Sequence, residues 1–554
     1  MLNFPPKALV LNAMKVFYSL LALMLGTTIP SRGADKPLTE EQRIVHTLNR
    51  LGFGPRPGDI ERVQKLGLNL YIQQQLHPEA LNDQAVETKT ADFSALTLTP
   101  RALNRLEIEA RQGGKQLKKK LQQKATQAGK EPSRKEMRAQ LTEKQRMALK
   151  ESAEAKERVA QASQQTLDNK LVRAMESEKQ LQEVLVDFWS NHFNIDVAKV
   201  RTAKIIDEQQ VIRPHVLGKF SELLHASAHS AAMMLYLDND QSTAAVGSVG
   251  RGKAKKQPGG LNENYAREVM ELHTLGVDGG YTQRDVTELA RCLTGWGVRG
   301  GKYSAEFEYH DSRHDKKAKE VLGLRLPAGG DQSDGEAALA LLARHPSTMR
   351  FISTKLCRRF VSDNPPASLV DRCVATWKRT DGDIREILTT ITSSPEFFSA
   401  AAYKSKVKSP FEFVVSAARA LGATYNVGEK TKGANQDFSK KTDVGSETCT
   451  AGQISLLGQP LFRYAFPTGY PEDSSKWVSS GALIGRINYA LKLTAGKLED
   501  LTVPTISEEK PDVLALRLLG QPLSATTRAT IQKQGAMGTK AVALLLGSPE
   551  FQRR

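Results

Sequence analysis

Two consecutive apolar helices that also carry charged side chains, predicted within residues 262–296, constrain this chain more than any other feature. The segment reads NENYAREVMELHTLGVDGGYTQRDVTELARCLTGW. Over 262–275 apolar residues recur every three or four positions, which predicts a helix. Asn264, Arg267, Glu268 and Glu271 form a separate polar stripe on it. A buried polar group without a partner costs about 1–3 kcal/mol, so the stripe is either a satisfied network or a functional site.

Two interpretations of this stripe remain open at the level of sequence. Glu268 and Glu271 are candidate acid/base or metal-ligating carboxylates. The alternative is a structural network in which Arg267 pairs with Glu268, with Glu271 or with a carboxylate of a neighbouring helix. Thr282 and Asp285 have the spacing of a capping box, which predicts where the next helix begins.

Three further polar residues are candidates for catalysis. His192 follows the aromatic pair Phe188-Trp189, where a histidine can act as a general base or ligand, or can simply cap the helix through a hydrogen bond. His314 and Asp315 are adjacent in a predicted loop rich in lysine, and loop pairs of this kind often carry site chemistry. The alternative for the loop pair is turn formation by the aspartate.

A candidate metal site lies on one predicted helix. Glu222, His225 and His229 are spaced so that all three can face one point. Helical carboxylate-bridged sites use a Glu-x-x-His pair, and zinc sites use histidines four residues apart. The alternative is a set of polar histidines on a helix of small residues. The sequence leaves open whether the protein binds a divalent metal, and it contains no P-loop, Rossmann, Gly-x-Ser-x-Gly or His-Glu-x-x-His motif.

The composition favours an all-α protein. Only 6% of the 554 residues are aromatic, and Ala, Leu, Glu, Lys and Gln dominate. We expect a multi-helix, bundle-like body with a small β-hairpin near 301–326 and a projecting charged helical hairpin near 101–180. The expected segments are a signal peptide at 1–34, an N-terminal helical segment at 35–100, the charged hairpin at 101–180, a helical core with the β-hairpin at 181–425, a polar loop at 426–450 and a C-terminal helical segment at 451–554.

The N-terminus predicts export. An apolar run at 16–25 follows Lys15 and is too short to span a bilayer, as in a cleaved signal peptide. The alternative is an uncleaved N-terminal anchor, and no other segment has transmembrane length. We therefore expect a periplasmic or secreted protein, whose four cysteines meet an oxidising compartment. Cys357 and Cys373 lie on two predicted helices joined by a turn, so they can face one another and form a disulfide; the alternative is that they are buried free thiols.

The net charge of +17 is concentrated in one segment. Residues 101–180 contain 20 Lys and Arg against 11 Asp and Glu. Because the two signs are interleaved and aromatic residues are missing there, a solvated helical pair fits better than a nucleic-acid surface. We expect no nucleic-acid partner. Attraction to anionic envelope lipids or acidic glycans is the alternative role for this charge.

Several short motifs in the same order resemble one bacterial family. They are Leu-Gly-Phe-Gly-Pro-Arg-Pro-Gly-Asp at 51–59, Phe-Trp-Ser-Asn-His-Phe at 188–193, Tyr-Leu-Asp-Asn at 236–239, the 262–296 segment, His-Asp at 314–315 with Lys319 and Leu-Gly at 322–323, and Gly-Tyr-Pro-Glu at 469–472 with Trp477. Together they resemble the family named domain of unknown function 1800 (DUF 1800). Two positions depart from its pattern, since Ser190 stands where the family has His and Lys319 is one place late.

The resemblance implies no agreed activity. It implies a partner protein of the family numbered 1501, which resembles sulfatases and alkaline phosphatases. We expect an exported cell-envelope binding or accessory protein. The alternative is a periplasmic or secreted hydrolase or metal-dependent enzyme whose site gathers His192, Glu268, Glu271, His314 and Asp315. Convergence of these side chains would favour the enzyme, and pairing among themselves or with the backbone would favour the binding protein.

Overall fold

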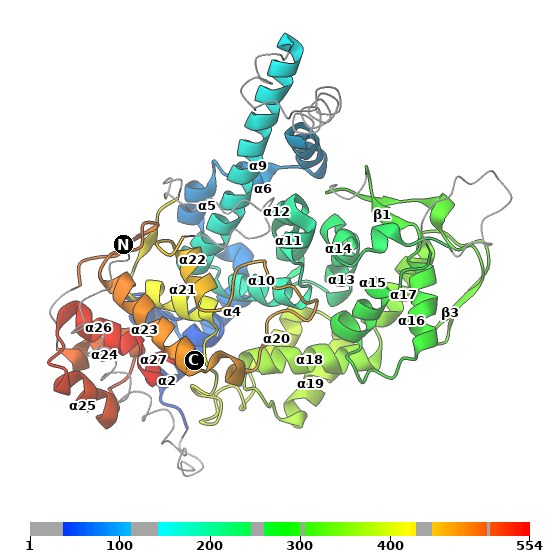
Figure 1. Ribbon diagram of the computed structural model, residues 1–554. Coiled ribbons are helices and arrows are strands. Elements are labelled where there is room, and N and C mark those ends of the chain that lie inside the picture. The colour runs from blue at the N-terminus through cyan, green and yellow to red at the C-terminus, as the bar shows by residue number, and fades with distance from the viewer. Residues whose placement is uncertain (1–36, 112–141, 245–259, 301–304, 428–445, 507–509) are drawn as a thin grey trace.

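The structure is a computed structural model that describes residues 37–111, 142–244, 260–300, 305–427, 446–506 and 510–554 (Figure 1). The predicted signal peptide at 1–34 lies outside the described residues. So do most of the predicted polar loop at 426–450 and the middle of the predicted charged hairpin. In the described residues no helix combines the length and apolar character needed to cross a membrane.

Helices make up most of the chain, which confirms the predicted fold class. The N-terminal helices are α2 (Glu40–Arg50), α3 (Asp59–Leu66), α4 (Leu68–Leu76), η1 (Pro78–Ala80), α5 (Gln84–Thr90) and α6 (Ser94–Thr97). The central ones are α9 (Glu143–Glu176), α10 (Gln180–His192), α11 (Val197–Val200), η2 (Arg201–Ala203), α12 (Lys204–Asp207), η3 (Glu208–Ile212), η4 (Arg213–His215), α13 (Phe220–Ala228), α14 (Ala231–Tyr236) and η5 (Asn239–Gln241).

The second half of the chain continues in the same way. Its first helices are α15 (Asn264–Glu268), η6 (Val269–Thr274), α16 (Gln283–Cys292), η7 (Asp311–Arg313), α17 (Ser333–Ala343), α18 (Pro346–Phe360), α19 (Ala367–Thr380), α20 (Ile384–Thr392) and α21 (Pro410–Ala420). The C-terminal ones are α22 (Thr450–Leu456), η8 (Ser474–Trp477), α23 (Ser480–Thr494), α24 (Pro511–Leu519), α25 (Ala525–Lys533), α26 (Gly538–Leu546) and α27 (Pro549–Gln552).

The strands form three small antiparallel pairs. They are β1 (Trp296–Val298) with β2 (Phe307–Tyr309), β3 (Lys319–Val321) with β4 (Leu324–Leu326), and β5 (Thr424–Tyr425) with β6 (Leu501–Thr502). The sequence predicted one small hairpin near 301–326, and the structure has strands of two separate pairs there. Leu322 and Gly323 both have positive φ, at 48° and 84°, which suits a two-residue hairpin turn. That turn pairs β3 with β4 and leaves β2 to pair with β1.

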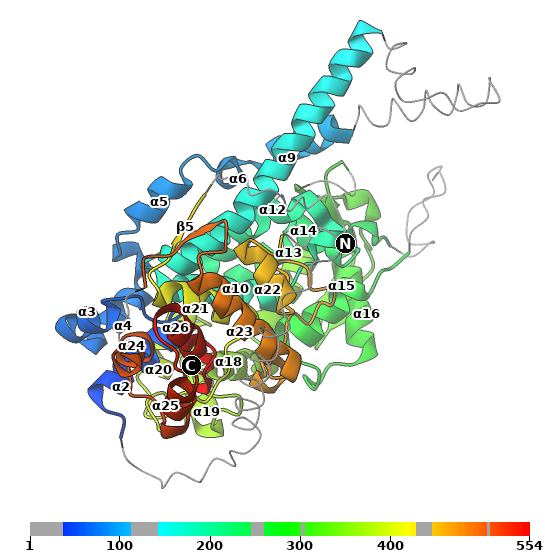
Figure 2. The same ribbon diagram turned by 60° about the vertical axis from the view of Figure 1, so that its left-hand side comes forward.

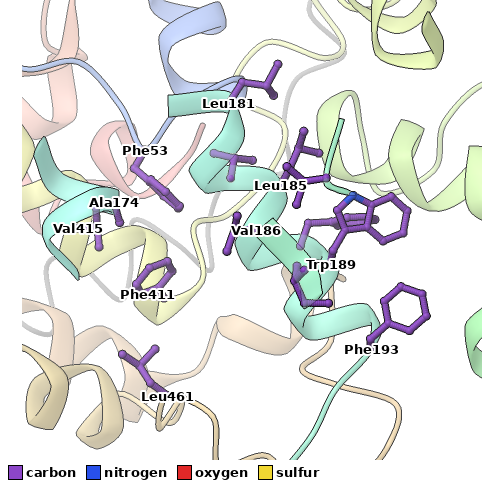
Figure 3. Packing of buried hydrophobic residues seen from close by; sticks show 14 of the residues in the cluster. Phe53, Ala174, Leu181, Leu185, Val186, Trp189, Phe193, Phe411, Val415 and Leu461 are labelled. Atoms are coloured by element: carbon purple, nitrogen blue, oxygen red, sulfur yellow. The ribbon is translucent and has the colours of Figure 1, made fainter. Parts of the chain in front are cut away.

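Helix α10 passes through the centre of the main hydrophobic core (Figure 3). Its side chains Leu181, Leu185, Val186 and Trp189 are at most 1% exposed. Residues from four other parts of the chain pack around it, namely Phe53, Ala174, Phe411, Val415 and Leu461. Burial of this helix on most sides holds segments together that are hundreds of residues apart in sequence.

Helix α9 combines the predicted projecting arm with a buried stem. Its first half extends away from the body in both views (Figures 1 and 2). Its second half enters the core, where Leu167, Leu171 and Met175 are at most 1% exposed. The charged segment is therefore peripheral at one end and part of the core at the other.

Cys357 on α18 and Cys373 on α19 face one another, as predicted. Their Sγ atoms are 3.6 Å apart and both thiols are buried. In this structure the two cysteines are free thiols. Because the sulfurs already adjoin, a disulfide would need only a small movement of the two helices.

Candidate functional site

The polar stripe of the 262–296 segment is arranged differently from the prediction. The helix predicted over 262–275 is an α-helix only to Glu268 and continues as a π-helix. The π turn inserts an extra residue, and the backbone amide of Leu275 accordingly donates to the carbonyl of Met270, five residues back, at 2.8 Å. The wider turn changes the spacing after Glu268, so the expected surface pairing of Arg267 with Glu271 is lost.

Arg267 pairs instead with Glu263, at 3.2 Å, and donates to Gln283 on α16 at 2.8 Å. The prediction of a buried pair with Glu268 or Glu271 was wrong, since the Arg267 side chain is 40% exposed. Thr282 caps α16 with Asp285 in a capping box, as predicted. This part of the segment is a hydrogen-bonded contact between two helices.

Glu268 and Glu271 are half-buried neighbours. Burial and the nearby charge of Glu271 raise the pKa of Glu268 above its ordinary value. Burial, followed by the charge of the nearby Glu271, raises the pKa of the Tyr281 phenol. The acid/base role predicted for the two glutamates therefore stays a prediction.

His192 is buried at the end of α10. Its Nε2 atom lies 3.1 Å from the carbonyl oxygen of His273. Trp189, Phe193 and Phe351 surround the ring. Burial, followed by the positive charge of Lys355, lowers the pKa of His192 far below its usual range. The imidazole is therefore neutral at physiological pH and joins α10 to η6.

His314 and Asp315 belong to a buried polar network that includes Arg291 and Thr294 of the 262–296 segment. His314 contacts the carbonyl oxygen of Thr294 through Nδ1 at 2.8 Å and Asp334 through Nε2 at 3.1 Å. The same carboxylate of Asp334 accepts from Lys319 at 2.7 Å. Arg291 donates to Asp315 at 2.9 Å. Each charged group therefore has a protein partner.

The histidines of the predicted metal site meet a carboxylate that sequence reasoning missed. Glu336 on α17 lies 2.8 Å from Nε2 of His229 and 3.5 Å from Nε2 of His225. Glu222 is exposed one turn earlier. Within the described part of the chain, no three His, Cys, Asp or Glu side chains are placed to hold a metal ion together. We therefore derive no metal chemistry from this cluster.

The candidate residues contact nearby backbone and side chains, and among the described residues no hydrogen bond or ion pair joins His192 to His314 or to Glu268. A different set of residues surrounds an open cavity beside α10. We call it the α10 cavity. Its lining includes the charged residues Lys170, Asp187, Lys204, Arg359, Lys406, Glu412, Glu472 and Arg554, and the polar or aromatic residues Phe188, Ser190, Asn191, Asn194, Gln459, Phe462, Tyr470 and Trp477.

Asn191 fixes one wall of the α10 cavity. Its side-chain amide donates to the carbonyl of Tyr470 at 2.8 Å, and its side-chain oxygen accepts from the Tyr470 amide at 2.7 Å. Gly469 has φ of 69°, and a Cβ there would lie 2.2 Å from the carbonyl oxygen of Asn191. Only glycine fits this close approach. Two motifs nearly 280 residues apart thus form one wall.

Glu412 forms the charged base of the cavity. It pairs with Arg359 and, at 3.0 Å, with Arg554. All three side chains are at most 10% exposed. Burial alone would raise the pKa of Glu412, but the charges of Arg359 and Arg554 outweigh it and lower the pKa to about 2. The carboxylate is therefore ionised throughout the physiological range.

The positive charge around Glu412 exceeds its single negative charge. Arg50 is fully buried beside this pair and donates to the Ala402 carbonyl at 2.6 Å and to Ser405. Burial first, and then the charge of Arg554, lowers its pKa well below the ordinary value. Among the described residues, Nε of Arg359 and both Nε and Nη1 of Arg554 have no hydrogen-bond acceptor. A buried donor without an acceptor is costly, so this place favours an added anion.

The lysines on the other walls have carboxylate partners. Lys170 lies 3.1 Å from Glu208 and 3.2 Å from Asp187, and these charges raise its pKa although burial alone would lower it. Lys204 pairs with Asp207 at 2.7 Å. The unbalanced charge of the α10 cavity is therefore at its arginines.

Lys406 adds an amine whose charge is easily lost. It is 3% exposed, pairs with Asp363 and donates to the carbonyl of Glu472 at 3.3 Å. Burial and then the charge of Arg554 lower the pKa of Lys406 to about 8. Its segment is held in place because Lys406 and Arg554 exchange backbone hydrogen bonds.

Sequence reasoning identified both motifs of the cavity wall but not its charged base. Within the Phe-Trp-Ser-Asn-His-Phe motif it selected His192, whereas the neighbouring Asn191 faces the cavity. Successive residues of a helix point about 100° apart, so one faces the core and the other the cavity. Arg359, Glu412 and Arg554 stand in no common motif, and the sequence carries no signal that they meet.

Comparison with protein families places this fold. The model of the family described as protein of unknown function (DUF1800) matches residues 46–553. Comparison with curated proteins and with solved structures gives no match. The matched region includes the walls and nearly all of the lining of the α10 cavity. The chain therefore belongs to the DUF1800 family, as its motifs predicted.

Proposed function

We propose that the protein binds a small anionic ligand, through a carboxylate, sulfate or phosphate group, in the α10 cavity. The observation that carries this proposal is that Arg359 and Arg554 share the single carboxylate of Glu412 while three of their N–H groups have no acceptor among the described residues. The proposal is a binding role, in line with the binding protein expected from the sequence.

The chemistry of the guanidinium group supports an oxyanion as the ligand. Arginine presents several N–H donors in a planar fork that matches carboxylate, sulfate and phosphate oxygens. Buried charges need partners, and an anion beside Arg554 would complete the pairing that Glu412 begins. Phe462, Tyr470 and Trp477 add apolar faces to the lining, which suits a ligand with an apolar part.

A titration with simple anions tests this proposal. Sulfate, phosphate and acetate should each be titrated into the full chain by calorimetry, with chloride at equal ionic strength as the reference. We expect saturable one-site binding by at least one oxyanion. A ligand at 100 times its dissociation constant should stabilise the fold by about 2.7 kcal/mol.

Two arginine variants separate binding from folding. Arg554→Gln should weaken the affinity at least tenfold, because it removes the unpartnered donors and the charge. Arg486→Gln is the matched control. Arg486 is buried as well, at 1% exposed, and burial lowers its pKa to about 10. It contacts Gln552 but lies outside the cavity lining. Equal weakening by both variants, or no saturable binding by the parent protein, would contradict the proposal.

We also propose that the protein is exported, as the apolar run at 16–25 predicts. Mass spectrometry of the protein from the cell envelope should find an N-terminus between about residues 27 and 36. An intact Met1 or Met14 in the soluble cell-envelope fraction would contradict export with signal removal. The alkaline-phosphatase-like partner implied by the family resemblance stays a prediction.

A further inference from the structure

We propose that Lys406 forms an imine with the aldehyde or ketone carbonyl of a ligand whose anionic group is held by Arg554 and Arg359. This inference rests on the proposed function, because the arginines supply the anion site. It goes further in naming the ligand class, an anionic carbonyl compound such as a 2-oxo acid, and in naming the residue that reacts.

The position of Lys406 supports this reaction. Its side chain lines the same cavity as Arg359 and Arg554. Its backbone amide donates to the carbonyl of Arg554, and the amide of Arg554 donates back at 2.8 Å, so the two residues are held side by side. An anionic carbonyl compound bound by the arginine would therefore have its carbonyl carbon near an amine.

The protonation state of Lys406 suits a nucleophile. With its pKa lowered to about 8 by burial and by Arg554, roughly a tenth of the amine is neutral at pH 7 and half of it at pH 8. A lysine in water is protonated almost completely at these pH values and therefore adds to carbonyl groups much more slowly. Bringing a cationic group close to an amine is a known way of activating a lysine.

A carboxylate is also present for the proton transfers. The carboxylate of Asp363 pairs directly with the Lys406 amine. Asp363 can therefore accept a proton from the amine and return it during the reaction.

The reaction balances without an added oxidant or reductant. The neutral amine nitrogen adds to the carbonyl carbon, and one N–H proton moves through Asp363 to the oxygen, which gives a carbinolamine. The second N–H proton then leaves and the oxygen departs as water, so that a carbon–nitrogen double bond replaces the carbon–oxygen double bond. Water reverses the same steps and releases the ligand.

A second lysine provides a matched comparison. Burial also lowers the pKa of Lys404 to about 8. Lys404 and Lys408 line a smaller cavity that contains Glu550 and does not contain Arg359 or Arg554. If an amine of low pKa were sufficient, Lys404 would react as readily as Lys406.

Reductive trapping with glyoxylate tests the inference. The full chain is incubated at pH 8 with glyoxylate and cyanoborohydride, which reduces an imine to a stable secondary amine, and the modified lysines are located by peptide mass spectrometry. A parallel sample receives acetaldehyde, which has the carbonyl group but no charge. We expect glyoxylate to modify Lys406 at least tenfold more than Lys404, and acetaldehyde to show no such preference.

Two variants and one unreactive ligand assign the cause. Arg554→Gln should remove the preference for Lys406, and Lys404→Arg should leave it unchanged. Glycolate has the carboxylate but no carbonyl, so its calorimetric titration measures anion binding alone. Binding of glycolate without modification of Lys406 would overturn the inference while the proposed function stands. If glycolate and glyoxylate both fail to bind, the inference fails, and the proposed function fails with it only when sulfate, phosphate and acetate do not bind either. Equal modification of Lys404 and Lys406 by glyoxylate would also overturn the inference.

Discussion

The 262–296 segment and the α10 cavity both place charged side chains against the helical core, but their charges are compensated in different ways. In the first region Arg267 is 40% exposed and has partners on its own helix and on the next one. In the second region Arg554 is 4% exposed and shares Glu412 with Arg359. Arg267 finds its partners locally, whereas Arg359 and Arg554 keep buried N–H donors without acceptors among the described residues.

This difference shows which polar cluster to regard as a site. Charged residues close in sequence find partners within a turn or two of helix, as Arg267 and Glu263 do. Buried charges that only the tertiary structure brings together have few possible ion-pair partners. Where too few groups of opposite charge lie nearby, an excess of one sign of charge remains. The α10 cavity is such a place, and the following predictions test the contrast.

The largest effect is expected from Glu412→Gln. This variant removes the only carboxylate paired with both Arg359 and Arg554 and leaves two buried cations together. The glutamine can still accept from the Ser409 amide, so the capping box of α21 is preserved. We expect a loss of about 3–5 kcal/mol in the free energy of unfolding, measured by urea denaturation at pH 7.

The acid limb of the stability curve provides the control. The pKa of Glu412 is about 2 in the folded state and 4.5 ordinarily, so its stabilisation is present above pH 4.5 and is lost as the pH falls towards 2. The parent should therefore lose more stability than Glu412→Gln over this range. If the free energy of unfolding falls equally with pH in the parent and in Glu412→Gln, Glu412 is not ionised in the folded protein.

A smaller effect is expected from Asp334→Asn, in the buried polar network that His314 joins to the 262–296 segment. The variant weakens the contacts with Lys319 and His314, although Lys319 also donates to the Lys317 carbonyl at 3.1 Å. We expect a loss of about 2 kcal/mol, because hydrogen bonds to a charged group are involved. Oxyanion affinity should not change. A weaker affinity in this variant would mean that the two regions are not independent.

The affinity of the cavity for oxyanions should depend on pH. Lys406 is charged below its pKa of about 8 and attracts the anion, so affinity should fall as the pH rises from 7 to 9, by up to about tenfold. Calorimetric titrations across this range measure the change. Lys406→Met should flatten the dependence, whereas Lys404→Met should retain it. If the affinity of Lys406→Met for oxyanions still depends on pH, a group other than Lys406 causes the dependence.

The smallest effect is expected from Arg267→Ala. Its ion pair with Glu263 is between partly exposed groups and lies on one helix, so the loss should be about 0.5 kcal/mol or less. Thermal melts compared with those of Glu412→Gln give the contrast directly. A loss of several kcal/mol would show that the 262–296 segment is the more tightly coupled of the two regions.

Part of the fold follows from local sequence. Thr282 and Asp285 predicted the start of α16 because a capping box involves only residues three apart. Cys357 and Cys373 were predicted to face one another because a single turn joins their two helices, and their Sγ atoms are 3.6 Å apart. The π turn at 269–274 could not be predicted, since it depends on how η6 packs against α17 and α18. That one turn displaced the expected partner of Arg267.

The sequence by itself determined the helical class, the family and the positions of several helix ends, because these depend on propensities, caps and short motifs that act within a few residues. Only the tertiary structure decided which charges meet. Arg359, Lys406, Glu412 and Arg554 each resemble an ordinary surface residue in the sequence, and packing around α10 brings them into one cavity. Because electrostatic interaction depends on distance and burial rather than on sequence separation, the charge excess that marks this cavity exists only in the folded chain.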